Sequence, residues 1–205
     1  MTERQVLVLY GSSRGASADA ADKFVKECAH HLTTTTDNTN DHTIHVSEPI
    51  ALDDFLKDPV WAPWVVIFVS SFGSGGGPRN GRQFRRKCDA WKQAHQDNPD
   101  LPKPLEGMHF AICGLGDSSY KTYMENPIVV TETLELLGAE LVGNRGVADS
   151  ADGEASQQKT IDEWMESMWE PLREVLSKEP SVSKEGLEKA RAFVLDDEDN
   201  NKDKQ

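Results

Sequence analysis

The sequence contains no apolar run that approaches the ~18 residues of a membrane-spanning helix. Strand-like sequence begins at Gln5, which leaves no room before it for a signal or transit peptide. We therefore expect a soluble cytoplasmic protein that does not interact with a membrane.

Positive charge is scarce, because the 205 residues include 22 Lys and Arg against 35 Asp and Glu, a formal net charge of −13. A nucleic-acid-binding protein needs a basic surface to contact phosphates, so this balance argues against a nucleic-acid partner. It remains compatible with protein partners, since complementary charges speed the encounter of two proteins.

Cysteine is also rare, and the three cysteines are far apart among apolar residues: Cys28, Cys88 and Cys113. This pattern predicts reduced thiols in a core and excludes a disulfide framework or a paired-cysteine metal site. The six histidines show no metal-ligand spacing and do not pair with a nucleophile. We therefore predict neither a metal site nor catalytic acid–base residues.

Continuous apolar runs at 6–10, 65–69 and 109–113 are typical of strands buried on both faces of a sheet. Shorter, more polar runs at 43–46 and 140–142 fit strands nearer the edges. Segments with apolar residues at helical spacing alternate with these runs. The alternation predicts an α/β domain with a five-stranded parallel sheet and helices on both faces.

The predicted domain spans residues 1–176, and residues 177–205 form a polar tail. A short helix is expected at about 183–194, with Leu187, Ala190 and Val194 as a weak apolar face. Residues 196–205 include almost no apolar side chain, so we expect the end to be disordered.

In an open parallel sheet, ligands bind beyond the carboxyl ends of the strands. The first loop (11–17) offers Ser12, Ser13, Arg14 and Ser17 directly before a helix, a composition that favours anion binding. It lacks the GxxxxGK[ST] and GxGxxG patterns of nucleotide sites. Taken alone, it could equally be a tight turn with a serine cap.

The second loop (70–81) and the third loop (114–123) are rich in glycine and hydroxyl residues. Phe72 in the second loop has no obvious core to enter, and the third loop carries Tyr120. Glycine allows close approach to a ligand, and an aromatic ring in such a loop can stack on a flat group. The three loops together suit a planar ring with a phosphate tail.

These loops resemble those of flavodoxin-like FMN domains, most closely the FMN domain of the diflavin reductases. YGSSRGAS at 10–17 is similar to the family's YGSQTGTA, and SFGSGGGPRN at 71–80 to T-[YF]-G-x-G-x-P-x-x-N. CGLGDSSYKTY at 113–123 is similar to FGLGxxxYxxF. The resemblance implies a three-layer sandwich with strand order 2-1-3-4-5 and FMN as the cofactor.

The resemblance also implies the residues of the cofactor site. In family order, these are Ser12, Ser13, Arg14, Gly15, Ala16 and Ser17 around the phosphate; Ser70, Ser71, Phe72 and Gly73 in the second loop; Leu115, Gly116, Asp117, Ser118, Ser119, Tyr120 and Tyr123 in the third; and Asp149 and Ser150 near the ribityl chain. Phe72 and Tyr120 would sandwich the flavin ring.

The chain departs from the family pattern in the first and second loops. Arg14 and Ala16 replace two threonines, so we expect Arg14 to compensate as a phosphate ligand. Gly76 and Gly77 replace the usual Asp and Pro, which should loosen the second loop and weaken FMN binding.

Basic residues cluster in and after the second loop, at Arg79, Arg82, Arg85, Arg86, Lys87 and Lys92. One interpretation is a solvated helix face. The other is a docking surface for an acidic partner or a nicotinamide phosphate. Residues 146–176 instead carry eight acidic and two basic residues, a net charge of −6.

The leading hypothesis is a monomeric FMN-binding electron-transfer protein that shuttles electrons between a separate NAD(P)H reductase and an acceptor protein. Oxidoreductase activity would then need a partner. A free-standing NAD(P)H-dependent FMN or quinone reductase is the alternative, because GSSRGAS at 11–17 also resembles the GSxRxxS loop of such enzymes. A cofactor-free scaffold is a third hypothesis.

Overall fold

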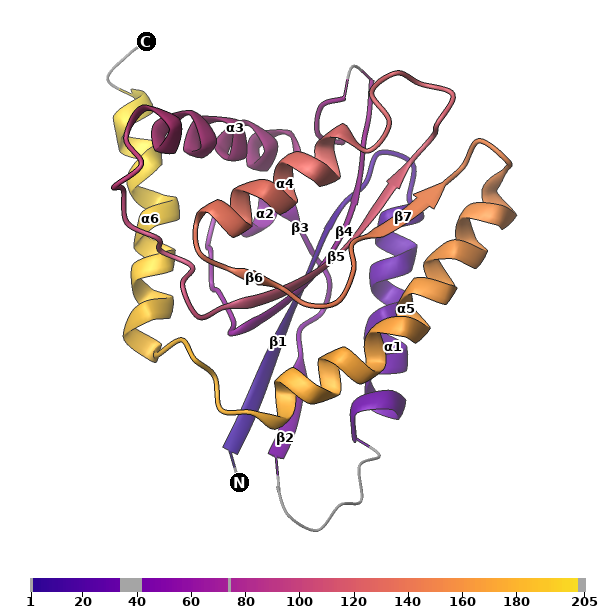
Figure 1. Cartoon of the computed structure of the whole chain (residues 1–205), viewed down its shortest axis with the longest axis horizontal. Coiled ribbons are helices and arrows are strands. Elements are labelled where there is room, and N and C mark those ends of the chain that lie inside the picture. Colours follow the sequence, from indigo (N-terminus) through magenta and orange to yellow (C-terminus); the bar gives the residue numbers. More distant parts are fainter. Residues whose placement is uncertain (1, 34–41, 74, 203–205) are drawn as a thin grey trace.

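The computed structural model describes residues 2–33, 42–73 and 75–202 (Figure 1). Within these residues, seven strand segments form one sheet: β1 (Thr2–Gly11), β2 (His42–Val46), β3 (Ile50–Ala51), β4 (Trp64–Ser70), β5 (His109–Gly116), β6 (Glu140–Leu141) and β7 (Gly146–Asp149). The long central strands follow the apolar runs of the sequence, as expected for strands covered on both faces.

The sheet is parallel, with the order β2-β1-β4-β5-β6. Each edge of the sheet consists of two short strands in line. At one edge β2 and then β3 pair with β1, and at the other β6 and then β7 pair with β5. The five positions across the sheet therefore follow the predicted order 2-1-3-4-5. The order of the strands reverses at β1, because β2 lies on one side of it and β4 on the other, and a ligand site is expected at the carboxyl ends of β1 and β4.

Helices cover both faces of the sheet (Figure 1). One face carries α1 (Ala16–Thr33) and α5 (Glu154–Ser177), and the other carries α2 (Leu52–Phe55), α3 (Arg82–Asp97), α4 (Glu125–Leu136) and α6 (Lys184–Lys202). The α4 helix ends as the sequence predicts, because Gly138 follows it with a φ of +101°.

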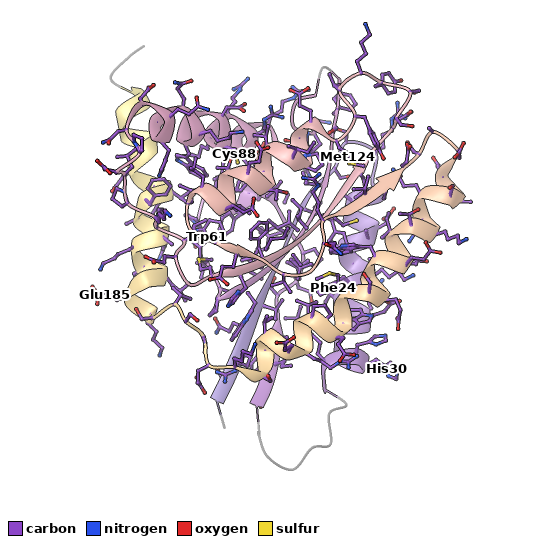
Figure 2. The ribbon with its side chains drawn as sticks, viewed as in Figure 1. Phe24, His30, Trp61, Cys88, Met124 and Glu185 are labelled. Atoms are coloured by element: carbon purple, nitrogen blue, oxygen red, sulfur yellow. The ribbon has the colours of Figure 1, made fainter. Side chains whose placement is uncertain are left out.

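Two apolar cores lie between the layers (Figure 2). Phe24, Phe68 and Trp169 pack between the sheet and the α1/α5 layer, and Phe84 and Trp91 pack on the opposite face. All three cysteines are free and buried, and burial raises each thiol pKa to about 12. They are core residues and not reactive groups.

The α6 helix is longer than the short helix expected from the sequence, and it packs on the core. Ala190 and Val194 are 0% and 1% exposed, and the Phe193 ring lies 5.2 Å from the Trp91 ring. Residues 203–205, in the end expected to be disordered, lie outside the described part of the chain. No helix of the described residues is long and apolar enough to cross a membrane.

Candidate functional site

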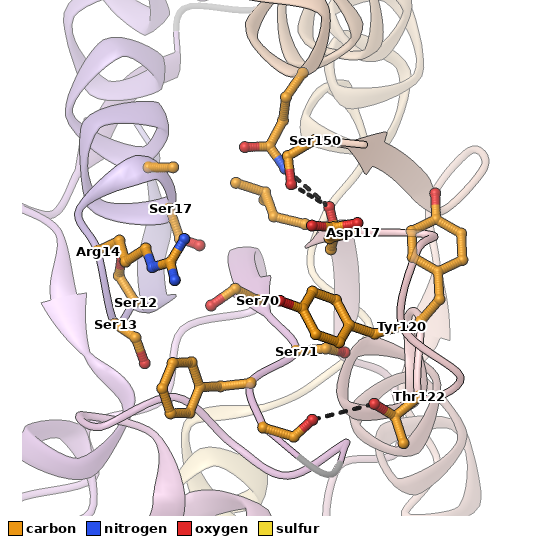
Figure 3. A pocket seen from close by; sticks show the side chains of 17 residues that line it. Ser12, Ser13, Arg14, Ser17, Ser70, Ser71, Asp117, Tyr120, Thr122 and Ser150 are labelled. Atoms are coloured by element: carbon orange, nitrogen blue, oxygen red, sulfur yellow. Dashed lines mark hydrogen bonds between the residues drawn. The ribbon is translucent and has the colours of Figure 1, made fainter. Parts of the chain in front are cut away.

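A cavity of about 340 Å³ opens at the carboxyl ends of β1, β4 and β5 (Figure 3). The three loops, the residue after β7 and the start of α5 line it with Ser12, Ser13, Arg14, Ala16, Ser17, Ser70, Ser71, Phe72, Gly73, Leu115, Gly116, Asp117, Tyr120, Thr122, Tyr123, Ser150 and Gln157. The cavity is within the size range of small-molecule sites.

The first loop is a closed turn at the amino end of α1. The Ser12 hydroxyl accepts a hydrogen bond from the Gly15 N–H at 2.9 Å, and Gly15 has a φ of +108° that favours glycine. The Ser12 N–H donates to Asn80 Oδ1 at 2.7 Å, which ties the first loop to the second. The first N–H groups of a helix lack partners within it, so the amino end of α1, whose Ala16 and Ser17 line the cavity, favours an anion there.

Ser17 and Arg14 give this end of the cavity its anion-binding character. The Ser17 hydroxyl is fully buried, and no hydrogen-bond partner for it exists among the described residues. Figure 3 shows the Arg14 guanidinium extending into the cavity beside Ser17. Because a buried unpaired hydroxyl is costly, a ligand that accepts its hydrogen bond gains affinity there.

Side chains of α3, of α4 and of the third loop donate hydrogen bonds to backbone carbonyls of the second loop. The Arg85 Nη1 donates to the Gly75 carbonyl at 2.6 Å, and the Asn126 amide donates to the Ser70 carbonyl at 2.8 Å. The Thr122 hydroxyl donates to the Gly73 carbonyl at 3.2 Å (Figure 3). These bonds fix the backbone of a glycine-rich segment.

The third loop is fixed by α5 and by the segment after β7. The Gln157 amide donates to the Gly116 and Ala148 carbonyls at 3.2 and 3.1 Å, and the Ser150 hydroxyl donates to the Gly116 carbonyl at 3.1 Å. Hydrogen bonds from Ser118, followed by the backbone N–H groups of Ala151 and Ser150, hold the Asp149 pKa below its ordinary value.

Two aromatic rings at the cavity are unusually exposed, Phe72 at 44% and Tyr120 at 62%. They come from the second and third loops, and Figure 3 shows Tyr120 across the cavity from Arg14. Exposed rings in a cavity offer stacking surface to a flat ligand.

The structure brings together most of the residues named from the sequence, but Gly15, Ser118, Ser119 and Asp149 do not line the cavity. Gly15 turns the backbone, and the Asp149 carboxylate faces the N–H groups of Ser118 and Ala151 at 2.9 and 3.0 Å. These residues support the wall of the cavity.

Sequence reasoning missed Thr122 and Gln157, which line the cavity. Thr122 lies between Tyr120 and Tyr123 in the sequence, and both tyrosines were predicted at the site, so its position could have indicated a place in the lining. Gln157 lies in a helix among polar residues, and only the packing of α5 against β7 reveals its role.

A family model described as flavodoxin matches residues 8–164. The chain belongs to the flavodoxin family. Among curated relatives, it is 25% identical over 179 residues to an NADPH–cytochrome P450 reductase of Aspergillus terreus, covering 86% of this chain and 24% of the relative. It is 31% identical over 169 residues to a mitochondrial pyruvate dehydrogenase [NADP(+)] of Euglena gracilis, and the match covers 82% of this chain and 8% of that relative. The flavodoxin-family chain thus spans a quarter or less of these relatives.

Solved structures of flavodoxins share the fold. A point mutant of Pseudomonas aeruginosa flavodoxin superposes with a TM-score of 0.55 at 19% identity, covering 82% of this chain and 99% of that one. Oxidised flavodoxin 1 of Bacillus cereus superposes with a TM-score of 0.53 at 18% identity, and the match covers 81% of this chain and 97% of that one.

Membership in the flavodoxin family implies FMN as the cofactor, and the residues present fit it. The unpaired Ser17 hydroxyl and the Arg14 guanidinium suit a phosphate at one end of the cavity. The exposed rings of Phe72 and Tyr120 suit a planar group at the other.

Proposed function

We propose that this chain is an electron-transfer flavoprotein that carries electrons between a separate NAD(P)H-oxidising reductase and an acceptor protein. Bound FMN supplies the redox chemistry. The observation that carries the proposal is a cavity that combines an anion-binding helix end with two exposed aromatic rings. The relatives support it, since the chain matches one part of longer proteins named as NADPH-dependent reductases.

In this proposal, the residues of the first loop hold the phosphate: Ser12, Ser13, Arg14 and Ser17, together with the N–H groups at the start of α1. Phe72 and Tyr120 orient the ring and exclude water from its faces. Leu115, Gly116 and Ser150 border the cavity between these ends. No side chain is assigned a proton-transfer role.

The first test is the visible spectrum of the purified protein, before and after FMN is added and the excess removed. Retained bands at about 450 and 375 nm with quenched fluorescence are expected for a stacked flavin. A colourless protein that retains no FMN would contradict the proposal.

A second experiment separates a carrier from a self-contained reductase. The FMN-loaded protein should oxidise NADPH at a negligible rate alone and pass electrons to an acceptor once a diflavin-type reductase domain is supplied. Rapid NADPH oxidation by the chain alone would favour the free-standing reductase instead.

A further inference from the structure

The basic residues between positions 79 and 92 divide into two groups in the structure. Three are engaged within the protein: Arg85 with Asp89 at 3.1 Å, Lys92 with Glu132 at 2.6 Å, and Lys87 with the Val194 carbonyl at 2.8 Å. Two of these contacts, those of Lys87 and Lys92, hold α3 to neighbouring helices.

The other three form what we call the arginine patch: Arg79, Arg82 and Arg86. All three are exposed, and none of their side chains has a hydrogen bond or ion pair within the part of the chain that the structure describes. Arg82 and Arg86 are four residues apart in α3 and therefore lie on one face of the helix.

The arginine patch borders the cavity. The Arg79 N–H donates to the Ser13 hydroxyl at 3.0 Å, and the neighbouring Asn80 accepts from the Ser12 N–H at 2.7 Å. Ser12 and Ser13 line the cavity, so Arg79 lies at its rim, and Arg82 and Arg86 follow in the first turns of α3.

Arg82 lies in the first turn of α3, where a positive charge is unfavourable. The amino end of a helix favours negative charge, yet the first turn of α3 has no acidic residue. The nearest compensation is Asp53, whose carboxylate accepts hydrogen bonds from the N–H groups of Gln83 and Phe84 at 2.9 and 3.0 Å. That carboxylate is thus engaged with the backbone.

The side of the cavity formed by the end of β7 and the start of α5 carries acidic residues. Ser150 and Gln157 line the cavity there, and residues 149–158 include Asp149, Asp152 and Glu154 but no basic residue. A partner that meets both sides of the cavity would experience an electric field with a defined direction.

We propose that the arginine patch docks an acidic redox protein and orients it at the rim of the cavity. This inference rests on the proposed electron-transfer function. The partner is identified by its charge: it presents carboxylates beside its own redox centre. The acidic side of the cavity would instead attract a basic partner.

The test uses one redox centre with two surface charges, native cytochrome c, which is basic, and succinylated cytochrome c, whose lysines carry carboxylates. FMN-loaded protein is reduced anaerobically and mixed with each form in a stopped-flow instrument. The double variant Arg82→Ala/Arg86→Ala should react about tenfold more slowly with the succinylated form at low salt, and the difference should vanish at high salt. Its rate with native cytochrome c should not fall.

The control is Lys26→Ala/Lys184→Ala, which also removes two positive charges, but at exposed positions on α1 and α6. Equal rates for the two double variants would overturn the patch proposal. If the reduced wild-type protein reduces neither form of cytochrome c, the proposed function fails, and the patch proposal fails with it.

An NMR titration, in which no electron is transferred, locates the docking site directly. Amide chemical shifts of the labelled protein are recorded while zinc-substituted succinylated cytochrome c is added. Perturbations should concentrate at residues 79–86. Perturbations confined to residues 149–170, or none at concentrations that affect the kinetics, would overturn the proposal.

Discussion

Arg14 and Ser17 stand at the amino end of α1, and both bear polar groups that the described protein does not satisfy. Arg14 was expected at a phosphate from the sequence, since it replaces a family threonine. Ser17 was one of several serines in the loop, with nothing local to single it out. Burial distinguishes it, because among the described serines only its hydroxyl is both fully enclosed and unpaired.

Replacing Arg14 by alanine should weaken FMN binding by about 10- to 100-fold, because a hydrogen bond to a charged group contributes ~1.5–3 kcal/mol. Titration of the apoprotein with FMN, followed by flavin fluorescence, gives the dissociation constant. Riboflavin is the matched control, since it lacks the phosphate: its affinity should hardly change. An equal loss for both ligands would assign Arg14 to the ring or to folding.

Ser17→Ala should have opposite effects on stability and on binding. In the ligand-free protein, the change removes a buried unpaired hydroxyl, so urea unfolding should show equal or greater stability, by up to ~1 kcal/mol. FMN affinity should nevertheless fall by about fivefold, because one donor is lost. A destabilised apoprotein would mean that the hydroxyl already has a partner.

Among the structural elements, the second loop is anchored by hydrogen bonds that its composition does not predict. Its glycines predict a loose segment, yet the Gly73 and Gly75 carbonyls accept hydrogen bonds from Thr122 and Arg85. Composition alone could not reveal this, because the donors lie 49 and 10 residues away in the sequence. The effect of the loop on FMN affinity stays a prediction.

Arg85 is the residue whose loss should free this loop. Its side chain is 12% exposed and also pairs with Glu125 at 3.7 Å. Arg85→Ala should weaken FMN binding by ~3–10-fold and reduce fluorescence quenching, because ordering the loop then opposes binding. Lys92→Ala is the control, since Lys92 is an ion-paired cation on the same helix and its partner is Glu132 of α4, not the loop. Similar losses in both variants would refute a specific role for Arg85.

Across the molecule as a whole, α6 completes one layer of the fold. The buried Arg4 anchors the segment before it, donating to the Leu176 carbonyl at 3.3 Å and pairing with Glu179 at 2.9 Å. Lys87 of α3 reaches the Val194 carbonyl of α6. The boundary at residue 176 was drawn from composition and stays a prediction.

Two alanines in α6 offer a matched test of its packing. Ala190 is 0% exposed, whereas Ala192 lies on the exposed face. Ala190→Asp should destabilise the protein by about 2–4 kcal/mol, because it places a charge in an apolar core, while Ala192→Asp should change stability by less than ~0.5 kcal/mol. Thermal unfolding of both variants measures the difference. Equal midpoints would show that α6 contributes little to the folded state.

Local regularities of the chain were sufficient to predict the central strands, the packed faces of the helices and the three loops of the site. Apolar runs mark buried strands, helical spacing marks packed faces, and glycine and hydroxyl residues mark the loops between them. The strand order followed from the likeness of these loops to the flavodoxin pattern. The same likeness predicted Phe72 and Tyr120 at one site, and the structure places both rings at one cavity.

Which polar groups are engaged and which are free emerged from the packed structure alone. Lys87 and Lys92 have partners on α6 and α4, while Arg79, Arg82 and Arg86 have none among the described residues, although these five look alike in the sequence. The physical reason is distance along the chain: Arg4 and Glu179 are 175 residues apart, and Lys87 and Val194 are 107. Such pairs form when the layers pack, and no local pattern encodes them.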